Sequence, residues 1–417
     1  MPPPAIILLI AAAAGLYMAW NIGANDLANA MGTSVGSGAL TLKQAVIIAA
    51  VFELAGAVLV GSHVTETVRK GMVDPAVFAP NPNLILWGMT SALLAAAIWL
   101  QVATALGMPV STTHSIVGAV VGFGLVGGGL GAIRWAKIGL IAASWIFSPL
   151  VGGAIAFGLF VFIRRRILEA PDPLASANRY APWFVFVVVF ILVLSFIYKG
   201  LKNLHLDFPL PQAMGIAAAV GLACTFIGRR FISRAVLPPA GADGRPTQSV
   251  EGVFRYLQIL TAGYVAFAHG SNDTANAIGP LAAILGVLRH EPLGAQVEVP
   301  TWVLLLGGMG IVLGLATYGY KVIETIGKKI THLTHASGFA AQFAAATTIL
   351  VGSKLSLPLS TTHTIVGAVV GVGLARGIAA LNLRMLRNIA NSWLITLPFT
   401  AVLTIILYKL ALLITGG

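Results

Sequence analysis

Long apolar runs alternate with short polar segments along almost the whole chain. Most of these runs are close to the about 20 residues that a helix needs to cross a bilayer. The main runs are 4–20, 44–62, 84–106, 138–163, 182–198, 212–228, 253–269, 301–320, 336–352 and a last span around 393–398. This pattern predicts an all-α polytopic membrane protein with about 10–12 transmembrane helices.

Composition supports the same class. Hydrophobic residues make up 58% of the chain and charged residues only 9%, whereas a soluble domain carries about a quarter charged residues. The net charge of +12 does not indicate nucleic-acid binding, because the basic residues lie between apolar runs, where they set topology. The single cysteine, Cys224, excludes an intrachain disulfide and a cysteine-based metal site. No basic segment precedes the first apolar run, so we expect a retained span rather than a signal peptide.

Basic residues cluster in two segments, around 164–180 and 229–255. Two predicted spans separate these segments, so both face the same side, which the positive-inside rule makes cytoplasmic. The 199–211 loop, with Lys199 and Lys202, then faces outward. We expect a multi-pass protein of the plasma or inner cell membrane.

Two stretches of the sequence occur twice. Residues 108–125 and 357–374 are identical at fourteen of eighteen positions, and 23–30 and 270–277 at six of eight. Asp26 and Ser111 are 85 residues apart, and Asp273 and Ser360 are 87 apart, so both stretches belong to one internal repeat.

The repeat sets the expected domains. We expect an N-terminal transport repeat at 1–166, two linker helices with a cytoplasmic linker at 167–251, and a C-terminal transport repeat at 252–417. An odd number of crossings per half would make the two repeats inverted in the membrane, as is usual in transporters. The Gly-x-x-x-Gly pairs 118/122 and 367/371 predict close helix packing, and the glycine-rich faces are compatible with a homodimer.

Each copy of the longer stretch places a proline and a Ser-Thr-Thr-His cluster directly before an uncharged apolar run. Serine and threonine cap helix starts, and the free N–H groups of a helix start attract anions. In a membrane this is the re-entrant half-helix site of transporters. We interpret the two clusters as halves of one oxyanion pocket, formed by Ser111, Thr112, Thr113, Ser360, Thr361 and Thr362.

Each copy of the shorter stretch contains an Asn-Asp-x-x-Asn pattern. Asparagines four positions apart share one helix face, and an aspartate inside a span is a functional candidate because burying it is costly. Carboxylate, amide and carbonyl oxygens together suit a hard cation. The predicted cation ligands are Asn25, Asp26, Asn29, Asn272, Asp273 and Asn276, with Asn25 and Asn272 also placed against the anion.

Charge counting indicates how such a site would work. The motif segments contain two carboxylates and no Lys or Arg. Adding a phosphate would bring the charge to about −3 or −4, while each helix start contributes only about half a positive charge. Anion and cation should therefore bind together, which makes symport the expected mode. The cation is Na⁺ on the Asp and Asn oxygens, or H⁺ on the carboxylates; no other cofactor is expected.

Four further polar residues are candidates for the site or its surroundings. His114 and His363 either donate to the anion or brace the hairpins. Glu53 lies inside an apolar run and is a candidate for the lining of the transport path. Gln342 lies within a span and either packs there or lines the pocket.

The doubled Gly-x-Asn-Asp-x-Ala-Asn-Ala and Pro-x-Ser-Thr-Thr-His signatures, taken together, resemble the inorganic phosphate transporter (PiT) family over essentially the whole chain. The resemblance implies secondary active import of inorganic phosphate with Na⁺ or H⁺ through two inverted repeats. It also implies that Asp26 and Asp273 bind the cation, with their asparagine neighbours, and that Ser111–Thr113 and Ser360–Thr362 bind phosphate. Some members have an acidic residue near the position of Gln342.

Three other functions compete with a phosphate symporter. A sulfate or other oxyanion permease could use the same scaffold. A Ser-His-Asp hydrolase is disfavoured because every candidate residue occurs in both halves, whereas a hydrolase needs one asymmetric nucleophile site. A channel is disfavoured because a pocket that needs co-bound charges suits fast conduction poorly. We therefore predict a transporter and not an enzyme.

Overall fold

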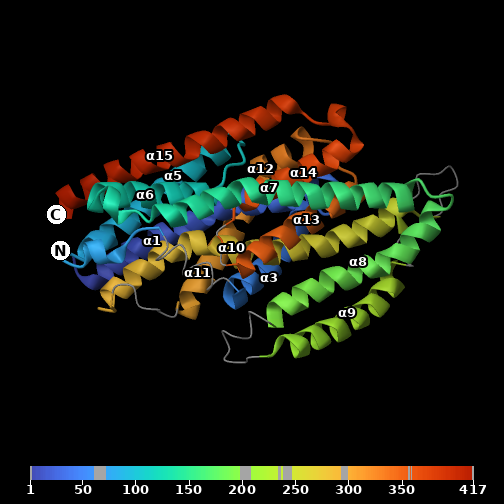
Figure 1. The fold of residues 1–417 in the computed structure, drawn as a ribbon, viewed down its shortest axis with the longest axis horizontal. Helices are drawn as coiled ribbons and strands as arrows, with labels where there is room; N and C mark the ends of the chain where they lie inside the picture. Colours follow the sequence, from blue (N-terminus) through green and yellow to red (C-terminus); the bar gives the residue numbers. More distant parts are fainter. Residues whose placement is uncertain are drawn as a thin grey trace.

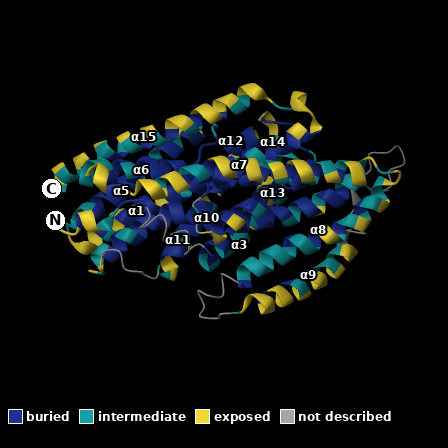
Figure 2. Ribbon diagram, in the orientation of Figure 1, coloured by how far each residue is buried: buried dark blue, intermediate teal, exposed yellow. Residues whose placement is uncertain are grey.

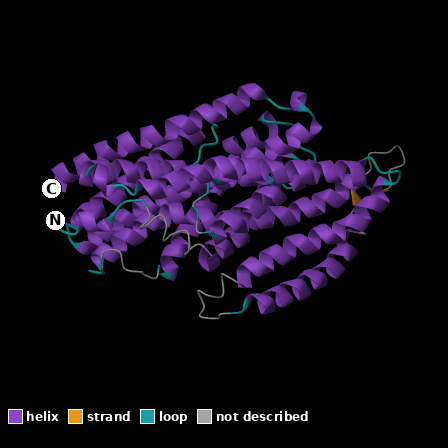
Figure 3. Ribbon diagram, viewed as in Figure 1, coloured by secondary structure: helices purple, strands orange, loops and turns teal. Residues whose placement is uncertain are grey.

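The computed structural model describes residues 2–60, 72–197, 208–232, 236–237, 247–292, 299–355, 357 and 359–415. Within these ranges the chain is almost entirely helical (Figure 3). The short strands β1 (Val236–Leu237) and β2 (Thr247–Gln248) pair in antiparallel register. Lys199 and Lys202 of the predicted outward loop lie outside the described residues, as does Pro358 of the second hairpin.

The elements follow the duplicated sequence. The first half contains α1 (Pro4–Ile22), the π-helical η1 (Gly23–Leu27), α2 (Ala28–Gly36), α3 (Leu42–Val60), η2 (Pro75–Phe78), α5 (Asn83–Ala105), α6 (Thr112–Gly128), η3 (Leu130–Ala132), α7 (Trp135–Ile163) and η4 (Arg164–Leu168). Two helices follow, α8 (Pro173–Ser195) and α9 (Leu210–Ile232), which pack against each other. The second half contains α10 (Val250–Leu288), α11 (Thr301–Tyr318), α12 (Tyr320–Glu324), η7 (Thr325–Lys329), α13 (His335–Lys354), α14 (Thr361–Arg376), η8 (Ile378–Ala380) and α15 (Leu383–Thr415).

The outer surface of the bundle is apolar. Nine helices of the described residues are long and apolar enough to cross a membrane. Leu413 and Ile414 at the end of α15 are 80% and 84% exposed, whereas the buried residues lie mostly in the middle of the bundle (Figure 2). A surface of this kind is matched to lipid. The structure thus confirms the predicted all-α polytopic membrane protein.

Two helical hairpins, α5–α6 and α13–α14, bury the last residues of their turns, Val110 and Ser111 in the first and Leu359 and Ser360 in the second. The helix α6 has 17 residues and is about 25 Å long, shorter than the about 30 Å of a bilayer core. The two turns touch each other, because the Thr113 hydroxyl donates to the Leu359 carbonyl at 2.9 Å and the Thr362 hydroxyl to the Val110 carbonyl at 3.1 Å. These are the expected half-helix hairpins, and their tips meet at one place.

Equivalent helices of the two halves run in opposite directions. Figure 1 shows α7 running away from the end of the bundle that holds both chain termini, and α15 running back toward it. The same view places the end of α7 and the start of α10 at one end of the bundle, so the described residues that flank these two helices within the basic segments lie on the same side. Which side of the membrane they face stays a prediction.

The halves are interleaved rather than separate. The first hairpin helix α6 packs on α15, and the second hairpin helix α14 packs on α7. The predicted glycine pairs form these contacts. A Cβ atom on Gly122 would lie 2.4 Å from the Ala401 carbonyl oxygen, and one on Gly371 only 2.1 Å from the Gly153 carbonyl oxygen. These glycine faces are therefore occupied within the chain and give no support to a homodimer.

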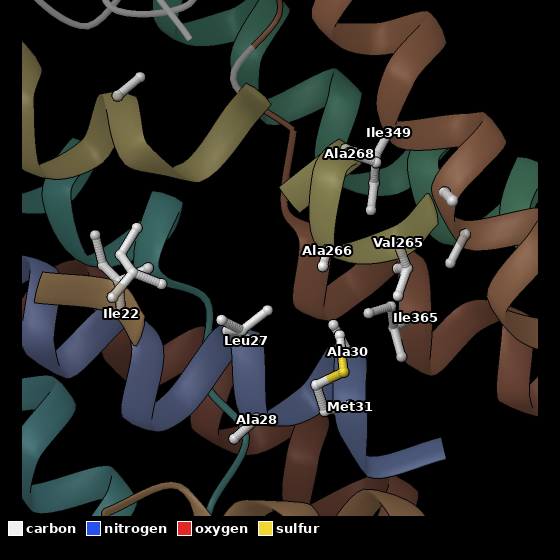
Figure 4. Close-up of a cluster of buried hydrophobic side chains, with 14 of the residues drawn as sticks. Ile22, Leu27, Ala28, Ala30, Met31, Val265, Ala266, Ala268, Ile349 and Ile365 are labelled. Carbon is white, nitrogen blue, oxygen red and sulfur yellow. The ribbon is translucent and has the colours of Figure 1, made fainter. Parts of the chain in front are cut away.

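Apolar side chains pack closely around the point where the hairpin tips meet α1, α2 and α10. Figure 4 shows this cluster, to which η1 and α2 contribute Leu27, Ala30 and Met31. These side chains are fully buried. Any polar group in this region is therefore shielded from lipid and from solvent.

The glycine contacts predict a stability effect. Gly122→Ala and Gly371→Ala should each lower the free energy of unfolding by about 1–3 kcal/mol, because a methyl group at either position overlaps a backbone carbonyl. Thermal unfolding of the purified protein in detergent would measure the loss. Gly158→Ala on α7, which has open space around it, is the matched control and should not destabilise. Equal melting temperatures for all three variants would contradict the packing described here.

Candidate functional site

The two half-helices begin with the same serine cap. Ser111 accepts a hydrogen bond from the His114 backbone N–H at 3.2 Å, and Ser360 accepts one from the His363 N–H at 3.1 Å. Both serines are fully buried. A serine side chain before a helix holds the chain in the extended conformation that starts the first turn, so it aims the next two threonines at the middle of the protein.

Asp26 is surrounded by hydroxyl groups from both hairpins. The Thr112 hydroxyl donates a hydrogen bond to Asp26 Oδ2, and the Thr362 hydroxyl donates one to Asp26 Oδ1. The Thr112 backbone N–H lies 3.3 Å from the same oxygen as the Thr112 hydroxyl, and the Asn29 amide lies 3.3 Å from the other. The carboxylate from the first half thus joins the tips of both hairpins.

Asp273 occupies the equivalent position in the second half. Its carboxylate accepts a hydrogen bond from the Thr361 hydroxyl, which also lies 3.5 Å from Asp26. Asn276 donates to the hydroxyls of Thr112 and Thr113, each at 3.3 Å. The predicted anion and cation groups therefore form one buried cluster and not two separate sites.

The first asparagine of each pattern faces the hairpin turn. Asn25 donates to Thr104 Oγ1 at 2.9 Å and to the Met108 carbonyl at 3.0 Å, and its oxygen accepts from the Val110 N–H at 3.1 Å. Asn272 donates to the equivalent atoms, Ser353 Oγ at 3.0 Å and the Leu357 carbonyl at 3.2 Å. These two side chains brace the turns against η1 and α10.

Several oxygens in the cluster are buried without a donor. Among the described residues no hydrogen-bond donor reaches Oδ1 of Asn29, Asn272 or Asn276. A buried amide oxygen normally has a partner, and a hard cation satisfies such an oxygen well. Asp26 and Asp273, together with His269, also offer ligand atoms that lie within 4.8 Å of one another. The donor set therefore fits a bound cation.

The two candidate histidines lie away from the carboxylates. The His114 and His363 rings meet edge to face, with centroids 4.4 Å apart, and they pack on Trp145 and Trp393 respectively. His363 Nδ1 lies 3.1 Å from the Trp145 carbonyl oxygen. This geometry favours the bracing role over direct contact with the anion.

Gln342 belongs to a separate polar network on the side of the cluster where α10 begins. Its amide donates to Ser34 Oγ at 2.6 Å, and its oxygen accepts from the Thr261 hydroxyl at 3.0 Å. Gln342 Nε2 also lies 3.4 Å from the carbonyl of Ala30, one residue after Asn29. It therefore adjoins the cluster without contacting either aspartate in the interactions described here.

Glu53 is buried beside a residue that the sequence patterns did not single out. His269 Nδ1 lies 3.0 Å from both Glu53 carboxylate oxygens, and Nε2 lies 3.0 Å from Asp273 Oδ2. The signal available in the sequence was spacing, because His269 precedes Asp273 by four positions and therefore shares its helix face. Within the described part of the chain, Glu53 is linked to the cluster through this histidine.

The profile of the phosphate transporter family matches residues 22–404, a range that includes both copies of each motif. The chain belongs to the phosphate transporter family. The predicted resemblance is therefore confirmed, and the chain is a transport protein rather than an enzyme.

Relatives support this membership along the full chain. A Pyrococcus abyssi protein whose name describes it as a phosphate permease is 47% identical to this chain. The match covers 97% of each chain. The chloroplastic inorganic phosphate transporter 2-1 of Arabidopsis thaliana is also 47% identical, with 94% of this chain and 70% of the relative covered. A solved structure titled the sodium-dependent phosphate transporter superposes with a TM-score of 0.90 at 42% identity, covering 98% of this chain and 100% of that one.

The hydrogen bonds of Asn25 to the first hairpin turn give a testable prediction. Asn25→Ala should lower the free energy of unfolding by about 1–3 kcal/mol, because it leaves the Thr104 hydroxyl and the turn backbone without their partner. A double-mutant cycle with Thr104→Ala, read by thermal unfolding, should give a coupling energy of about 1 kcal/mol. Asn388→Ala, at an exposed asparagine of α15, serves as the control. A coupling energy of zero would remove the bracing role.

Proposed function

We propose that this chain imports inorganic phosphate by symport with Na⁺, through an alternating-access site where the two repeats meet. The observation that carries the proposal is the direct contact of both aspartates with the hairpin threonines. Groups suited to a cation and groups suited to an anion share hydrogen bonds, so neither ion can bind without affecting the other.

The cation is held by the two Asn-Asp-x-x-Asn patterns. Asp26 and Asp273 supply carboxylate oxygens, and Asn29 and Asn276 supply amide oxygens that have no donor in the described part of the chain. Asn25 and Asn272 position the hairpin turns beside these ligands. Na⁺ takes oxygen ligands of these kinds, and the similar solved protein is titled sodium-dependent. H⁺ on the carboxylates is the alternative.

Phosphate is held at the two half-helix starts. The hydroxyls of Thr112, Thr113, Thr361 and Thr362 donate to its oxygens, together with Ser111, Ser360 and the free N–H groups of the first helical turns. A hydroxyl that donates to a carboxylate can rotate and donate to phosphate instead. Anion oxygens would thus replace the carboxylate contacts of Thr112, Thr361 and Thr362, and a bound cation would compensate the carboxylates.

Charge makes the coupling strict. The motif segments contain two carboxylates and no Lys or Arg, so phosphate alone would bring about −3 or −4 into a buried site. Since burying uncompensated charge is costly, phosphate should bind only with cations. The same argument holds for sulfate, so an oxyanion permease is the second candidate, and competition of sulfate with phosphate uptake separates the two.

The repeat organisation supplies the rest of the mechanism. We assign 1–166 and 252–417 to the two transport repeats and 167–251 to the linker helices and cytoplasmic linker. The protein spans the cell membrane with the basic segments 164–180 and 229–255 in the cytoplasm. The hairpin tips meet at the centre, so movement of one repeat against the other would open the site to one side at a time.

Loss of either central carboxylate should abolish coupled transport. Asp26→Asn and Asp273→Asn should each reduce sodium-driven uptake of radiolabelled phosphate into proteoliposomes by at least about 100-fold, because the variant lacks the charge that binds the cation. Asp172→Asn, which changes an exposed helix cap to another good cap, is the matched control. Normal uptake by both central variants would remove the cation-site assignment.

The driving ion is tested with the unmodified protein. We expect an inward Na⁺ gradient to drive phosphate uptake and an inward H⁺ gradient alone to leave it near the background. Uptake with H⁺ alone would assign the carboxylates as proton carriers. Uptake of sulfate and not phosphate would leave the scaffold assignment in place and replace the substrate.

A further inference from the structure

A cavity of about 380 Å³ lies beside the first hairpin turn, between the turn, η7 and the start of α15. This volume is within the about 300–1,000 Å³ that is typical of small-molecule sites. We call it the Lys329 cavity. The polar side chains in its lining are Thr325, Lys329, Asn388, Asn391 and Ser392.

The Lys329 cavity adjoins the central cluster through the hairpin turn. Met108 lines the cavity, and its carbonyl accepts a hydrogen bond from the Asn25 amide at 3.0 Å. Pro109 also lines the cavity, and the carbonyl of the next residue, Val110, accepts the Thr362 hydroxyl at 3.1 Å. The turn backbone therefore separates the cavity from the groups that we propose to hold phosphate.

The cavity lies on the side of the protein to which the end of α7 points. Figure 1 shows that α15 starts away from the end of the bundle that holds both chain termini. Arg164, directly after α7, donates to the Ala375 carbonyl at the end of α14 at 2.6 Å. The Asn382 N–H, just before α15, donates to the Ile330 carbonyl, just after η7, at 3.0 Å. The cavity is therefore on the side that the positive-inside rule makes cytoplasmic.

The charge of the cavity differs from that of the central cluster. The Lys329 side chain is 44% exposed, and its ammonium lies 3.9 Å from Glu324 Oε1, which is a loose contact between two exposed groups and contributes little. No aspartate or glutamate is among the described lining residues. An ammonium has three donors, and an asparagine amide has two. The cavity therefore suits an oxyanion that carries no co-bound cation.

The second repeat has an equivalent cavity with a more apolar lining. It measures about 390 Å³ and lies between the second hairpin turn and the start of α7. When the Ser-Trp pairs 144–145 and 392–393 are aligned, Leu140 is equivalent to Asn388 and Ala143 to Asn391. All four residues line their cavities. The segment equivalent to η7, 67–71, lies outside the described residues, so the comparison concerns the walls formed by α7 and α15.

The two asparagines of α15 need a polar environment. Asn388 and Asn391 are both exposed and lie in the first turns of a helix that is long and apolar enough to cross a membrane. A polar side chain against lipid is costly, and such residues usually face a water-filled cavity. The Lys329 cavity is therefore hydrated, whereas Leu140 and Ala143 give its equivalent an apolar wall that suits lipid.

We propose that the Lys329 cavity is a second, weaker phosphate subsite, which holds the anion between the central cluster and the cytoplasmic side. Lys329, Asn388 and Asn391 donate to the phosphate oxygens there. The inference rests on the proposed function, since it takes phosphate as the transported anion. It assigns the two equivalent cavities different tasks, because the asparagines occur in one repeat alone.

Cysteine labelling of the protein in phosphatidylcholine nanodiscs tests the proposal. Cys224 is the single cysteine of the chain, so Cys224→Ser provides a background without thiols. On this background Asn391→Cys should react with the anionic reagent 2-sulfonatoethyl methanethiosulfonate. In Na⁺-free buffer, inorganic phosphate at about ten times its dissociation constant should slow the reaction about tenfold, because only the unoccupied fraction reacts.

The equivalent cavity supplies the matched control. Ala143→Cys on the same background should react slowly, with no effect of phosphate, because its cavity is apolar. Asn388→Cys and Leu140→Cys form a second pair at equivalent positions if the first pair does not fold. Equal reactivity within a pair, or reaction of the α15 cysteines that phosphate does not slow, would overturn the inference.

The lysine can be tested in the same assay. Adding Lys329→Gln to Asn391→Cys should raise the phosphate concentration that halves the labelling rate about fivefold, the effect of one exposed charge at contact distance in water. Lys328→Gln, at a neighbouring exposed lysine that does not line the cavity, should leave that concentration unchanged. Equal effects of the two variants would overturn the role of Lys329.

The source of the anion and the proposed function are tested separately. Labelling that anionic phosphatidylglycerol slows, and inorganic phosphate does not, would assign the cavity to a lipid headgroup and overturn the inference. Slowing by phosphate only when Na⁺ is present would place the effect at the central cluster, which would overturn the subsite and leave the symport intact. Slowing without Na⁺, together with no sodium-driven uptake, would refute the symport and support the subsite.

Discussion

The contact between threonine hydroxyls at the hairpin tips and the two buried aspartates is the interaction on which the site depends. Thr112 and Thr362 come from different halves of the chain, yet both donate to Asp26. A buried carboxylate is costly unless it is paired or accepts hydrogen bonds. The same bonds therefore stabilise the aspartate and hold the tips of two half-helices against it. Loosening them for a substrate would loosen the contact between the halves.

That contact is possible only because the backbones approach closely elsewhere. Gly23 lies against the carbonyl of Ile311, and Gly270 against the carbonyl of Glu53. The hairpin helices α6 and α14 pack through glycines on α15 and α7 of the opposite half. With no water in the bilayer core to drive association, such packing supplies much of the attraction between helices. The small residues thus bring polar groups from distant segments to one place.

The two halves have equivalent helices and motifs, but not every charged residue of the cluster is present in both copies. Most of the cluster is duplicated, but the Glu53–His269 pair occurs beside Asp273 alone, and isoleucines stand at the equivalent positions beside Asp26. In the duplicated scaffold, each of the two carboxylates accepts a hydrogen bond from a threonine of a hairpin. Single substitutions can then change the electrostatics at one of them, because buried charges interact strongly over a few ångströms.

The sequence by itself determined the membrane class, the internal repeat and the residues of the cluster. These features are local or periodic: apolar runs of membrane length, a proline and serine at a helix start, and motifs repeated at matched distances. Asp26, Asp273 and the Ser-Thr-Thr clusters could be selected in this way, and the tertiary structure brings them together. The tertiary structure alone decided that His269 joins Glu53 to Asp273, and that Asn25 and Asn272 brace the hairpin turns. It also decided that His114 and His363 pack between tryptophans. Those outcomes depend on which helix faces which across hundreds of residues, as for Glu53 and His269, which are 216 positions apart, and no local pattern carries that information.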